Sequence, residues 1–335
     1  MDGTGLWAWF LFDSGLPAQR AKGLLSAWQD QGLTLEAALA QLPGRARTLG
    51  LTPAEAARLA LPEQLPEPSA LRWDDAFYPR GLRALPLRVR PALLFYQGEP
   101  VLLSRPILTL APSTLGGATG DASSPDRQLL RETLALLIGE AVLMAVYEGS
   151  DQAGLLLQEI ADADGEALLF AKSGLDVRDP GPWEEALVEA GRLLIVSPLP
   201  GHVAYQPAWD QVLQEVAVAA AEALLLTGDA ARLPQAVIGL GNKPAFAIAG
   251  ATPEVAPAPN VQPSSNPAGV LTWLDDVLPT PGLDETITVE PDVDLADGEA
   301  EVELGPPPSP DEILDTLSKG GAIPDVLRKR LLGEE

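Results

Sequence analysis

The chain contains no cysteine and a single histidine, His202. Disulfide bonds, thiolate catalysis and cysteine-based zinc sites are therefore excluded, and one histidine cannot build a histidine metal cluster. We accordingly expect neither a metal ion nor another cofactor. The absence of cysteine also fits a protein of the reducing cytoplasm.

Long apolar segments are lacking as well. The longest run, near Val216–Leu226, is interrupted by Glu222 and falls short of the roughly 18 residues that a membrane span needs. Residues 1–5 carry no basic group of the kind that opens a signal peptide. We expect a cytoplasmic protein without a membrane segment.

Basic residues are scarce, because 22 Lys and Arg stand against 47 Asp and Glu, a formal net charge of −25. The first 110 residues are nearly balanced, and the excess of acid lies in the middle and C-terminal parts of the chain. Phosphate binding depends largely on Lys and Arg that displace counterions, so this composition works against tight binding of nucleic acid. Apolar residues nevertheless make up 46% of the chain, which predicts a globular core.

The pattern of apolar residues divides the chain into distinct parts. Residues 1–61 show helical periodicity broken by Gly and Pro and predict a small all-α domain, and the Pro-rich residues 62–73 predict a linker. Residues 74–250 alternate short apolar strands with amphipathic helices. This alternation predicts an α/β fold, a Rossmann-like, doubly wound and mostly parallel sheet. Ligands of such sheets usually lie at the carboxyl ends of the strands.

The C-terminal part differs in composition. Residues 251–308 are rich in Pro, Ala, Asp and Glu and predict a disordered acidic linker with one short helix at Val270–Val277. Residues 309–335 regain helix start and stop signals and predict short C-terminal helices. This acidic tail is a candidate binding element for another protein.

Four short motifs follow one another between residues 74 and 250. They are Tyr78-Pro79-Arg80-Gly81 with Arg90–Gly98, then Lys172–Val177 with Pro180, then Gly191–Ser197 with Pro200-Gly201, and last Gly241–Gly250. Each motif alone is unspecific, but their order and spacing resemble those of the DprA/Smf family of DNA-processing proteins. The resemblance implies a Rossmann-like fold that is preceded by a small helical domain.

The resemblance also implies a function. Members of this family bind incoming single-stranded DNA, often as dimers, and help to load recombinase during natural transformation. We therefore expect a protein that is not an enzyme, with single-stranded DNA, a recombinase or other protein, and a second copy of the chain as candidate partners. The candidate DNA- or nucleotide-binding residues are Gly149, Ser150, Asp151, Lys172, Ser173, Gly174, Ser197, Lys243, Arg80, Arg83 and Arg88.

Several basic residues of the family's site are missing. The family's Gly-Ser-Arg after the first Rossmann strand is replaced by Ala111–Thr114, and the basic residue and histidine of its Gly-Ile-Asp segment are absent around Gly149–Gly154. Each lost arginine removes a charge-assisted phosphate contact. We therefore expect that the chain retains the Rossmann-like fold of the family and that its phosphate site is degenerate. The alternative is a DprA-derived protein-interaction or scaffold module that no longer binds DNA.

Other interpretations concern individual residues. Ser197, His202 and Asp210 suggest a hydrolase only weakly, because no Gly-x-Ser-x-Gly motif surrounds the serine, and His202 is expected to be an exposed loop residue. The basic stretch Arg72–Arg90 either contacts single-stranded DNA together with its aromatic neighbours or pairs with nearby acidic residues. A nucleotide-like ligand at the strand ends follows from the fold alone.

Overall fold

The computed structural model describes residues 3–59, 65, 67–87, 89–112, 125–150, 153–227, 243–248, 261–264 and 266–278. The chain divides into two compact units, Met1–Pro281 and Gly282–Glu335, and every described residue belongs to the first. The candidate residues Arg88 and Asp151 lie outside the described residues, and so do the predicted helices of 309–335.

Residues 3–59 form short helices, as their periodicity predicts. Two of them, α1 (Thr4–Ala8) and the π-helical turn Trp9–Asp13, are continuous, and the others are α2 (Ala18–Asp30), α3 (Leu35–Arg45) and α4 (Pro53–Arg58). Trp28 of α2 is fully buried among them and packs against Phe10 in a tilted arrangement with 5.4 Å between ring centroids. Its indole N–H donates to the Leu49 carbonyl at 2.9 Å, so this buried tryptophan has a partner for its polar end.

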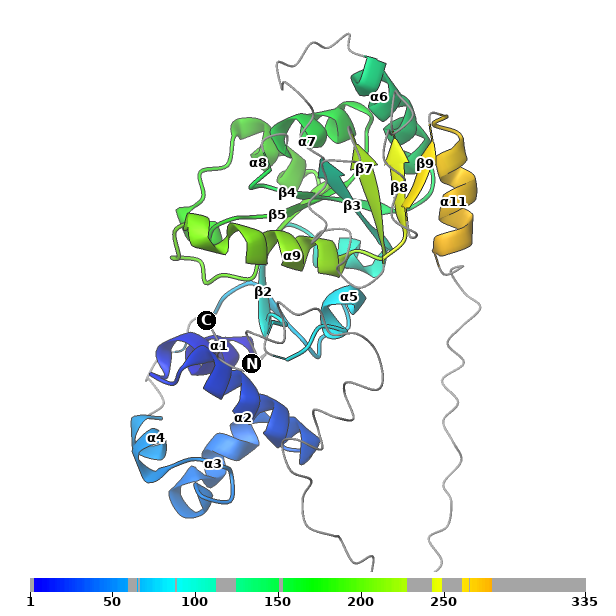
Figure 1. The fold of residues 1–335 in the computed structure, drawn as a ribbon. Helices are drawn as coiled ribbons and strands as arrows, with labels where there is room; N and C mark the ends of the chain where they lie inside the picture. The colour runs from blue at the N-terminus through cyan, green and yellow to red at the C-terminus, as the bar shows by residue number, and fades with distance from the viewer. Residues whose placement is uncertain are drawn as a thin grey trace, which may run out of the picture. The chain divides into compact units, whose positions relative to one another are not determined.

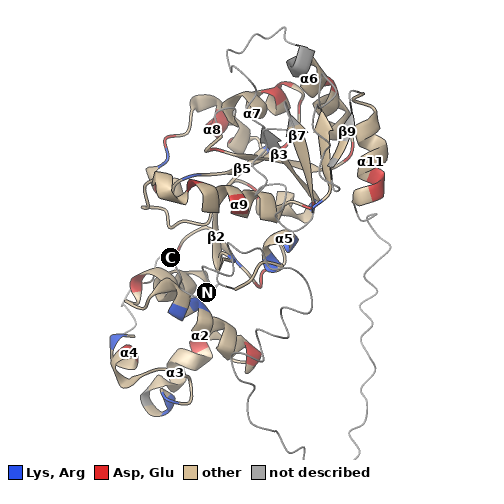
Figure 2. Ribbon diagram, viewed as in Figure 1, with Lys and Arg blue, Asp and Glu red and all other residues tan. Residues whose placement is uncertain are grey.

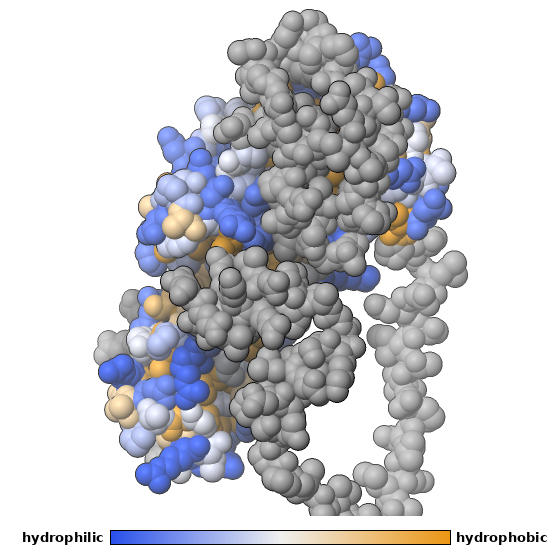
Figure 3. Space-filling view, viewed as in Figure 1, coloured by the Kyte–Doolittle hydropathy of each residue, from blue (hydrophilic) through white to orange (hydrophobic). Residues whose placement is uncertain are grey.

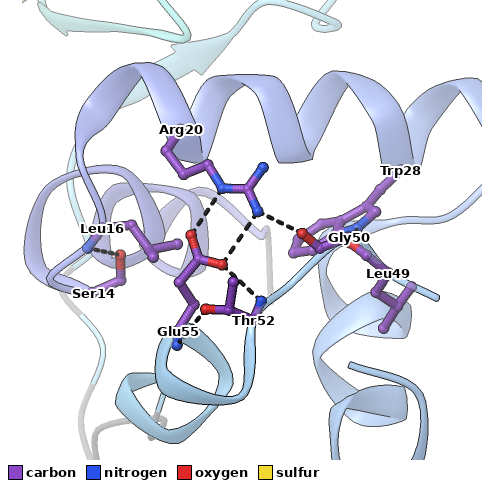
Figure 4. A network of polar contacts seen from close by, with 8 residues as sticks. All are labelled: Ser14, Leu16, Arg20, Trp28, Leu49, Gly50, Thr52 and Glu55. Carbon is purple, nitrogen blue, oxygen red and sulfur yellow. Dashed lines mark hydrogen bonds and ion pairs between the residues drawn. The ribbon is translucent and has the colours of Figure 1, made fainter. Parts of the chain in front are cut away.

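A polar network joins α2 to the start of α4 (Figure 4). The Thr52 hydroxyl accepts from the Glu55 N–H, and the Glu55 carboxylate accepts from the Thr52 N–H, which is a reciprocal capping box. Arg20 of α2 reaches the same carboxylate at 2.9 Å and also donates to the Gly50 carbonyl. The guanidinium hydrogen bond and the cap together hold the pKa of Glu55 at about 2.

The remaining elements build one mixed sheet, shown in Figure 1, with nine strands in the described residues. In spatial order the strands run β1-β2-β6-β5-β4-β3-β7-β8-β9. The β1–β2 and β2–β6 pairs are antiparallel and every other pair is parallel. The strand bounds are β1 Ala70–Arg72, β2 Leu93–Gln97, β3 Ile107–Pro112, β4 Leu143–Tyr147, β5 Ala167–Phe170, β6 Leu193–Ser197, β7 Ala223–Thr227, β8 Ala245–Ile248 and β9 Val261–Ser264.

Helices cover both faces of this sheet. One buried cluster joins one face to α6 (Pro125–Ile138), α7 (Ala153–Asp162) and α11 (Gly269–Val277), with α8 (Pro182–Glu189) packed beside it. The other cluster joins the second face to α9 (Asp210–Ala220) and to the short helix α5 (Arg80–Arg83). The predicted α/β class with a doubly wound, mostly parallel sheet is therefore confirmed.

The short 3₁₀ turns lie at strand and helix ends, at Pro100–Ser104, Leu175–Val177 and Pro207–Trp209. The strand order reverses between β3 and β7, which is where ligands of such sheets commonly bind. The segments that follow these two strands, 113–124 and 228–242, lie outside the described residues.

Two parts of the chain are more regular than the sequence predicts. Residues 70–72, inside the expected linker, form β1, and residues 261–264 of the expected disordered segment form β9. The short helix predicted at Val270–Val277 is confirmed as α11, and it packs on the sheet instead of lying in a disordered linker. The reason is burial. Trp273 of α11 is 4% exposed and packs against Phe246 of β8 in a tilted arrangement with 5.3 Å between ring centroids, so this short helix covers an apolar face of the sheet. The other boundaries of the proposed domains stay predictions.

The described surface is mostly hydrophilic in the view of Figure 3, with apolar residues interspersed among polar ones. Large exposed apolar side chains such as Val101 and Val212 are spread over different elements. Among the described helices, none has both the length and the apolar character to cross a membrane.

Candidate functional site

The carboxyl ends of β4, β5 and β6 bring six of the predicted site residues to one edge of the sheet. Because these strands are parallel neighbours, the residues that follow them lie side by side. The predicted residues at this edge are Gly149, Ser150, Lys172, Ser173, Gly174 and Ser197. We refer to this region as the carboxyl edge.

The loops after β5 and β6 are locked together by close backbone contacts. A side-chain carbon at Gly174 would overlap the Pro200 carbonyl oxygen, and one at Gly201 would overlap the Asp176 carboxylate. The Gly174 N–H donates to the Val203 carbonyl at 2.8 Å, and the Asp176 N–H donates to the Gly201 carbonyl at 3.0 Å. Two of the motifs that carry the family resemblance therefore have a structural reason to contain glycine.

The Ser197 hydroxyl is used within the fold. It is fully buried, donates to the Ser173 carbonyl at 2.8 Å and accepts from the Leu199 N–H at 3.1 Å. His202 is exposed, as the sequence predicts, and Asp210 accepts from two tyrosines. These partners give the serine no base, so the arrangement does not support hydrolysis by Ser197.

A carboxylate occupies two hydrogen-bond donors of the carboxyl edge that could otherwise bind an anion. Glu148, directly after β4, accepts the Lys172 N–H at 2.9 Å through one oxygen and Nε of Arg178 at 2.7 Å through the other. Nη2 of Arg178 donates to Glu184 at 2.7 Å, and Glu184 also caps the start of α8. The Arg178 side chain is only 8% exposed, and the two carboxylates raise its pKa despite the opposing effect of burial.

Next to this ion-pair cluster lies an exposed aromatic ring beneath a cation. The Lys172 ammonium lies 5.4 Å from the ring centroid of Tyr205, a cation–π distance. The Tyr205 hydroxyl donates to Asp210 at 3.3 Å, and Tyr147 donates to the same oxygen at 2.6 Å. Lys172 therefore takes part in both groups, through its backbone toward Glu148 and through its side chain toward Tyr205.

Asp210 begins α9, and its charge opposes phosphate binding there. A carboxylate in the first turn already compensates the positive end of the helix dipole. Burial, and then the hydrogen bond to Asp210, raise the pKa of Tyr147, so this phenol stays a hydrogen-bond donor. A side-chain carbon at Gly149 would overlap the Tyr147 ring and crowd Asp210, so Gly149 makes room for this pair.

The carboxyl edge also contains a buried hydroxyl group. The Ser150 hydroxyl oxygen is buried and has no hydrogen-bond partner among the described residues. The two residues that follow it, 151 and 152, lie outside the described part of the chain. Within the same described residues, no group of three or more metal-ligating side chains forms a metal site.

The predicted residues Arg80, Arg83 and Lys243 lie elsewhere, near the C-terminal end of α9. Lys243 precedes β8 and donates to the carbonyls of Ala219 at 2.9 Å and of Ala221, so a cation caps the negative end of the helix. Gly81 of α5 packs so closely on Ala219 that a side-chain carbon would overlap its carbonyl. Figure 2 shows the basic residues of α5, and Asp and Glu on α8, α9 and α11.

The basic stretch ahead of β2 makes contacts within its own segment. Arg72 pairs with Asp74 and Asp75 at 3.2 and 3.3 Å, as one of the two interpretations of the sequence predicted for this stretch. Arg83 donates to the carbonyls of Asp75 and Ala76, and Arg90 donates to the Leu85 carbonyl at 2.9 Å. Much of this basic charge therefore organises residues 72–91.

Three residues that make the contacts of the carboxyl edge escaped the sequence-based prediction, Glu148, Arg178 and Tyr205. All three lie in loops, where no periodicity marks a position. Arg178 directly follows the Lys172–Val177 motif, and Tyr205 stands two residues before Pro207, so an aromatic or basic residue just beyond a motif is the signal that was present.

Comparison with known proteins gives structural neighbours only. No protein-family model matches the chain, and no curated protein matches it. It is similar to the X-ray structure of DNA processing protein A (DprA) from Streptococcus pneumoniae, with a TM-score of 0.56 and 16% identity over 76% of this chain and 89% of that chain. A second neighbour is DNA processing protein A from Helicobacter pylori, described for its single-stranded DNA binding mode, with a TM-score of 0.46 and 14% identity over 63% of this chain and 100% of that chain. The chain has a DprA-like fold, so the predicted likeness is confirmed at the level of fold.

Proposed function

We propose that the protein is a DNA-processing protein that is not an enzyme, and that it binds single-stranded DNA weakly at the carboxyl edge. The observation that carries this proposal is the Lys172–Tyr205 pair, an exposed ring with an ammonium above it. Aromatic side chains of this kind stack on bases of any sequence, at roughly 1–3 kcal/mol per base, and a nearby cation contacts the backbone phosphate. The buried, internally bonded Ser197 supports a role without catalysis.

The wider role follows from the fold by analogy with the DprA/Smf family. We propose a cytoplasmic recombination mediator of natural transformation that passes single-stranded DNA to a recombinase, with a second copy of the chain as a further candidate partner. The binding is weak in this proposal because Glu148 and Asp210 place negative charge at the same edge. A net charge of −25 adds long-range repulsion that salt screens only in part.

A titration with labelled oligo-dT at low and moderate salt tests this proposal. The variant Tyr205→Ala should weaken binding by roughly 5- to 150-fold, because one stacked base is lost. The variant Lys172→Ala should also weaken binding and reduce the salt slope by about 0.7, the value for one phosphate contact on a single strand. Val212→Ala, at an exposed position of α9, is the matched control and should bind as the native protein does.

Arg80 and Arg83 provide the second arm of the experiment. They lie toward the other end of α9, so Arg80→Ala and Arg83→Ala should leave binding unchanged in this proposal. If these variants lose binding while Tyr205→Ala keeps it, the DNA contact lies on α5 and the assignment to the carboxyl edge is wrong.

The second candidate is a protein-interaction or scaffold module that no longer binds DNA. It is favoured by one specific observation, the Glu148 carboxylate that already takes up the Lys172 N–H and Arg178. Absence of oligo-dT binding by the native protein even at low salt would refute the first proposal and leave this one.

A further inference from the structure

The carboxylate of Glu148 is held in the way a protein holds a bound oxyanion. One oxygen accepts a backbone N–H, that of Lys172 at 2.9 Å, and the other accepts a guanidinium N–H, that of Arg178 at 2.7 Å. A backbone donor beside an arginine is a recurring arrangement for binding phosphate oxygens, with charge-assisted bonds of about this length. Here the acceptor comes from the chain itself.

The arginine of this group has unused donor capacity. The Arg178 side chain is 8% exposed, and its Nη1 is buried without a hydrogen-bond partner among the described residues. Nε and Nη2 each bind a carboxylate at 2.7 Å. A buried donor without a partner lowers the stability of the fold. A phosphate group has more acceptor oxygens than a carboxylate, so it could accept from this donor as well as from the others.

The charges of this cluster are unbalanced in its present state. One guanidinium faces two carboxylates, Glu148 and Glu184, which leaves one net negative charge in a partly buried place. Removing the Glu148 carboxylate would leave Arg178 paired with Glu184 alone and would free two donors at the rim, where the Glu148 side chain is 19% exposed.

We propose that Arg178 and the Lys172 N–H form an oxyanion site for a phosphate group, which Glu148 occupies as a built-in competitor. A phosphate binds there when the Glu148 side chain leaves the two donors. That the phosphate belongs to single-stranded DNA rests on the function proposed above, since Lys172 also contacts Tyr205. Binding of inorganic phosphate does not depend on that function.

The test measures binding of inorganic phosphate by the full-length chain, by calorimetry and by the rise of the melting temperature. Glu148→Ala should bind phosphate about tenfold or more tightly than the native protein, because two charge-assisted donors become free. Glu185→Ala is the matched control, since it removes one exposed carboxylate of α8 and changes the net charge equally. The double variant Glu148→Ala/Arg178→Met should lose the gain.

A second variant keeps the test decisive if the first is unstable. Glu148→Gln retains the volume of the side chain but not its charge, and its gain in phosphate affinity should be smaller than that of Glu148→Ala. Two outcomes overturn the proposal: folded Glu148 variants that bind phosphate no better than Glu185→Ala, or unfolded variants that phosphate does not restore. If phosphate binding increases but no protein of the series binds oligo-dT, the oxyanion site stands and the proposed DNA-binding function fails.

Discussion

Replacing Trp273 with alanine tests whether α11 packs on the sheet. The composition of residues 251–308, which is rich in Pro and acidic residues, does not predict this contact. The Trp273 side chain is 4% exposed and its ring lies 5.3 Å from that of Phe246, which is fully buried. Burial of about 200 Å² of aromatic surface at roughly 25 cal/mol per Å² corresponds to about 5 kcal/mol, an upper estimate because the unfolded chain is already partly compact. Measured Trp-to-Ala losses in cores are about 3–5 kcal/mol. We therefore expect Trp273→Ala to lower the free energy of unfolding by about 3–4 kcal/mol.

Urea unfolding followed by far-UV circular dichroism measures this loss. Thr272→Ala is the matched control, because Thr272 is the preceding residue of the same helix and is exposed. Its effect should stay within about 0.5 kcal/mol of zero, as for most surface substitutions. A Trp273→Ala loss below about 1 kcal/mol, comparable to that of Thr272→Ala, would refute the argument that α11 covers the sheet.

Two further predictions concern the helical region and the locked loops. Because Arg20 and the Thr52 cap lower the pKa of Glu55 from 4.5 to about 2, the folded state gains stability above the ordinary carboxyl pKa and loses that gain as the pH falls from about 4.5 toward 2. Melting temperatures between pH 2 and 6 should therefore fall less steeply for Glu55→Gln than for the native protein, and parallel curves would contradict this. Gly174→Ala should lower the melting temperature, because the added carbon overlaps the Pro200 carbonyl. Gly154→Ala, at an open position of α7, should instead be neutral or stabilise the fold by about 0.4–1 kcal/mol, and equal effects of the two substitutions would show that the loops after β5 and β6 are not tightly packed.

The strands of the parallel sheet could be predicted closely because each is a short apolar run bounded by Gly, Pro or charge. The alternation predicted for residues 74–250 is confirmed in the described residues, where helices α6 to α9 separate the successive strands from β3 to β7. The two edge strands escaped prediction for physical reasons. β1 has only three residues, too few for a period, and β9 contains Pro263, which a sequence pattern counts against a strand although an edge position tolerates it.

For the candidate site, the sequence could predict the position of the loops but not the contacts between their side chains. Motif glycines indicated where the loops after β4, β5 and β6 lie, and six of the expected residues meet there. The partners of these loops come from positions far along the chain. Arg178 reaches back to Glu148, and Asp210 reaches back to Tyr147, and neither pairing leaves a spacing that sequence alone can indicate. Lys243 lies in a motif that resembles the family's, but its side chain caps the C-terminal end of α9, away from the carboxyl edge.

These contacts change what the family-like motifs can say about function. Gly174 and Gly201 are required by the packing of two loops, and Ser197 is required by the Ser173 carbonyl, whether or not a ligand ever binds. The motifs therefore indicate the fold and do not by themselves indicate DNA binding. In the proposed function, the residues that decide the charge at the carboxyl edge, Glu148, Lys172 and Arg178, determine whether DNA binds. Because the Glu148 carboxylate accepts from both the Lys172 N–H and Arg178, the proposed phosphate binding depends on where the Glu148 side chain lies.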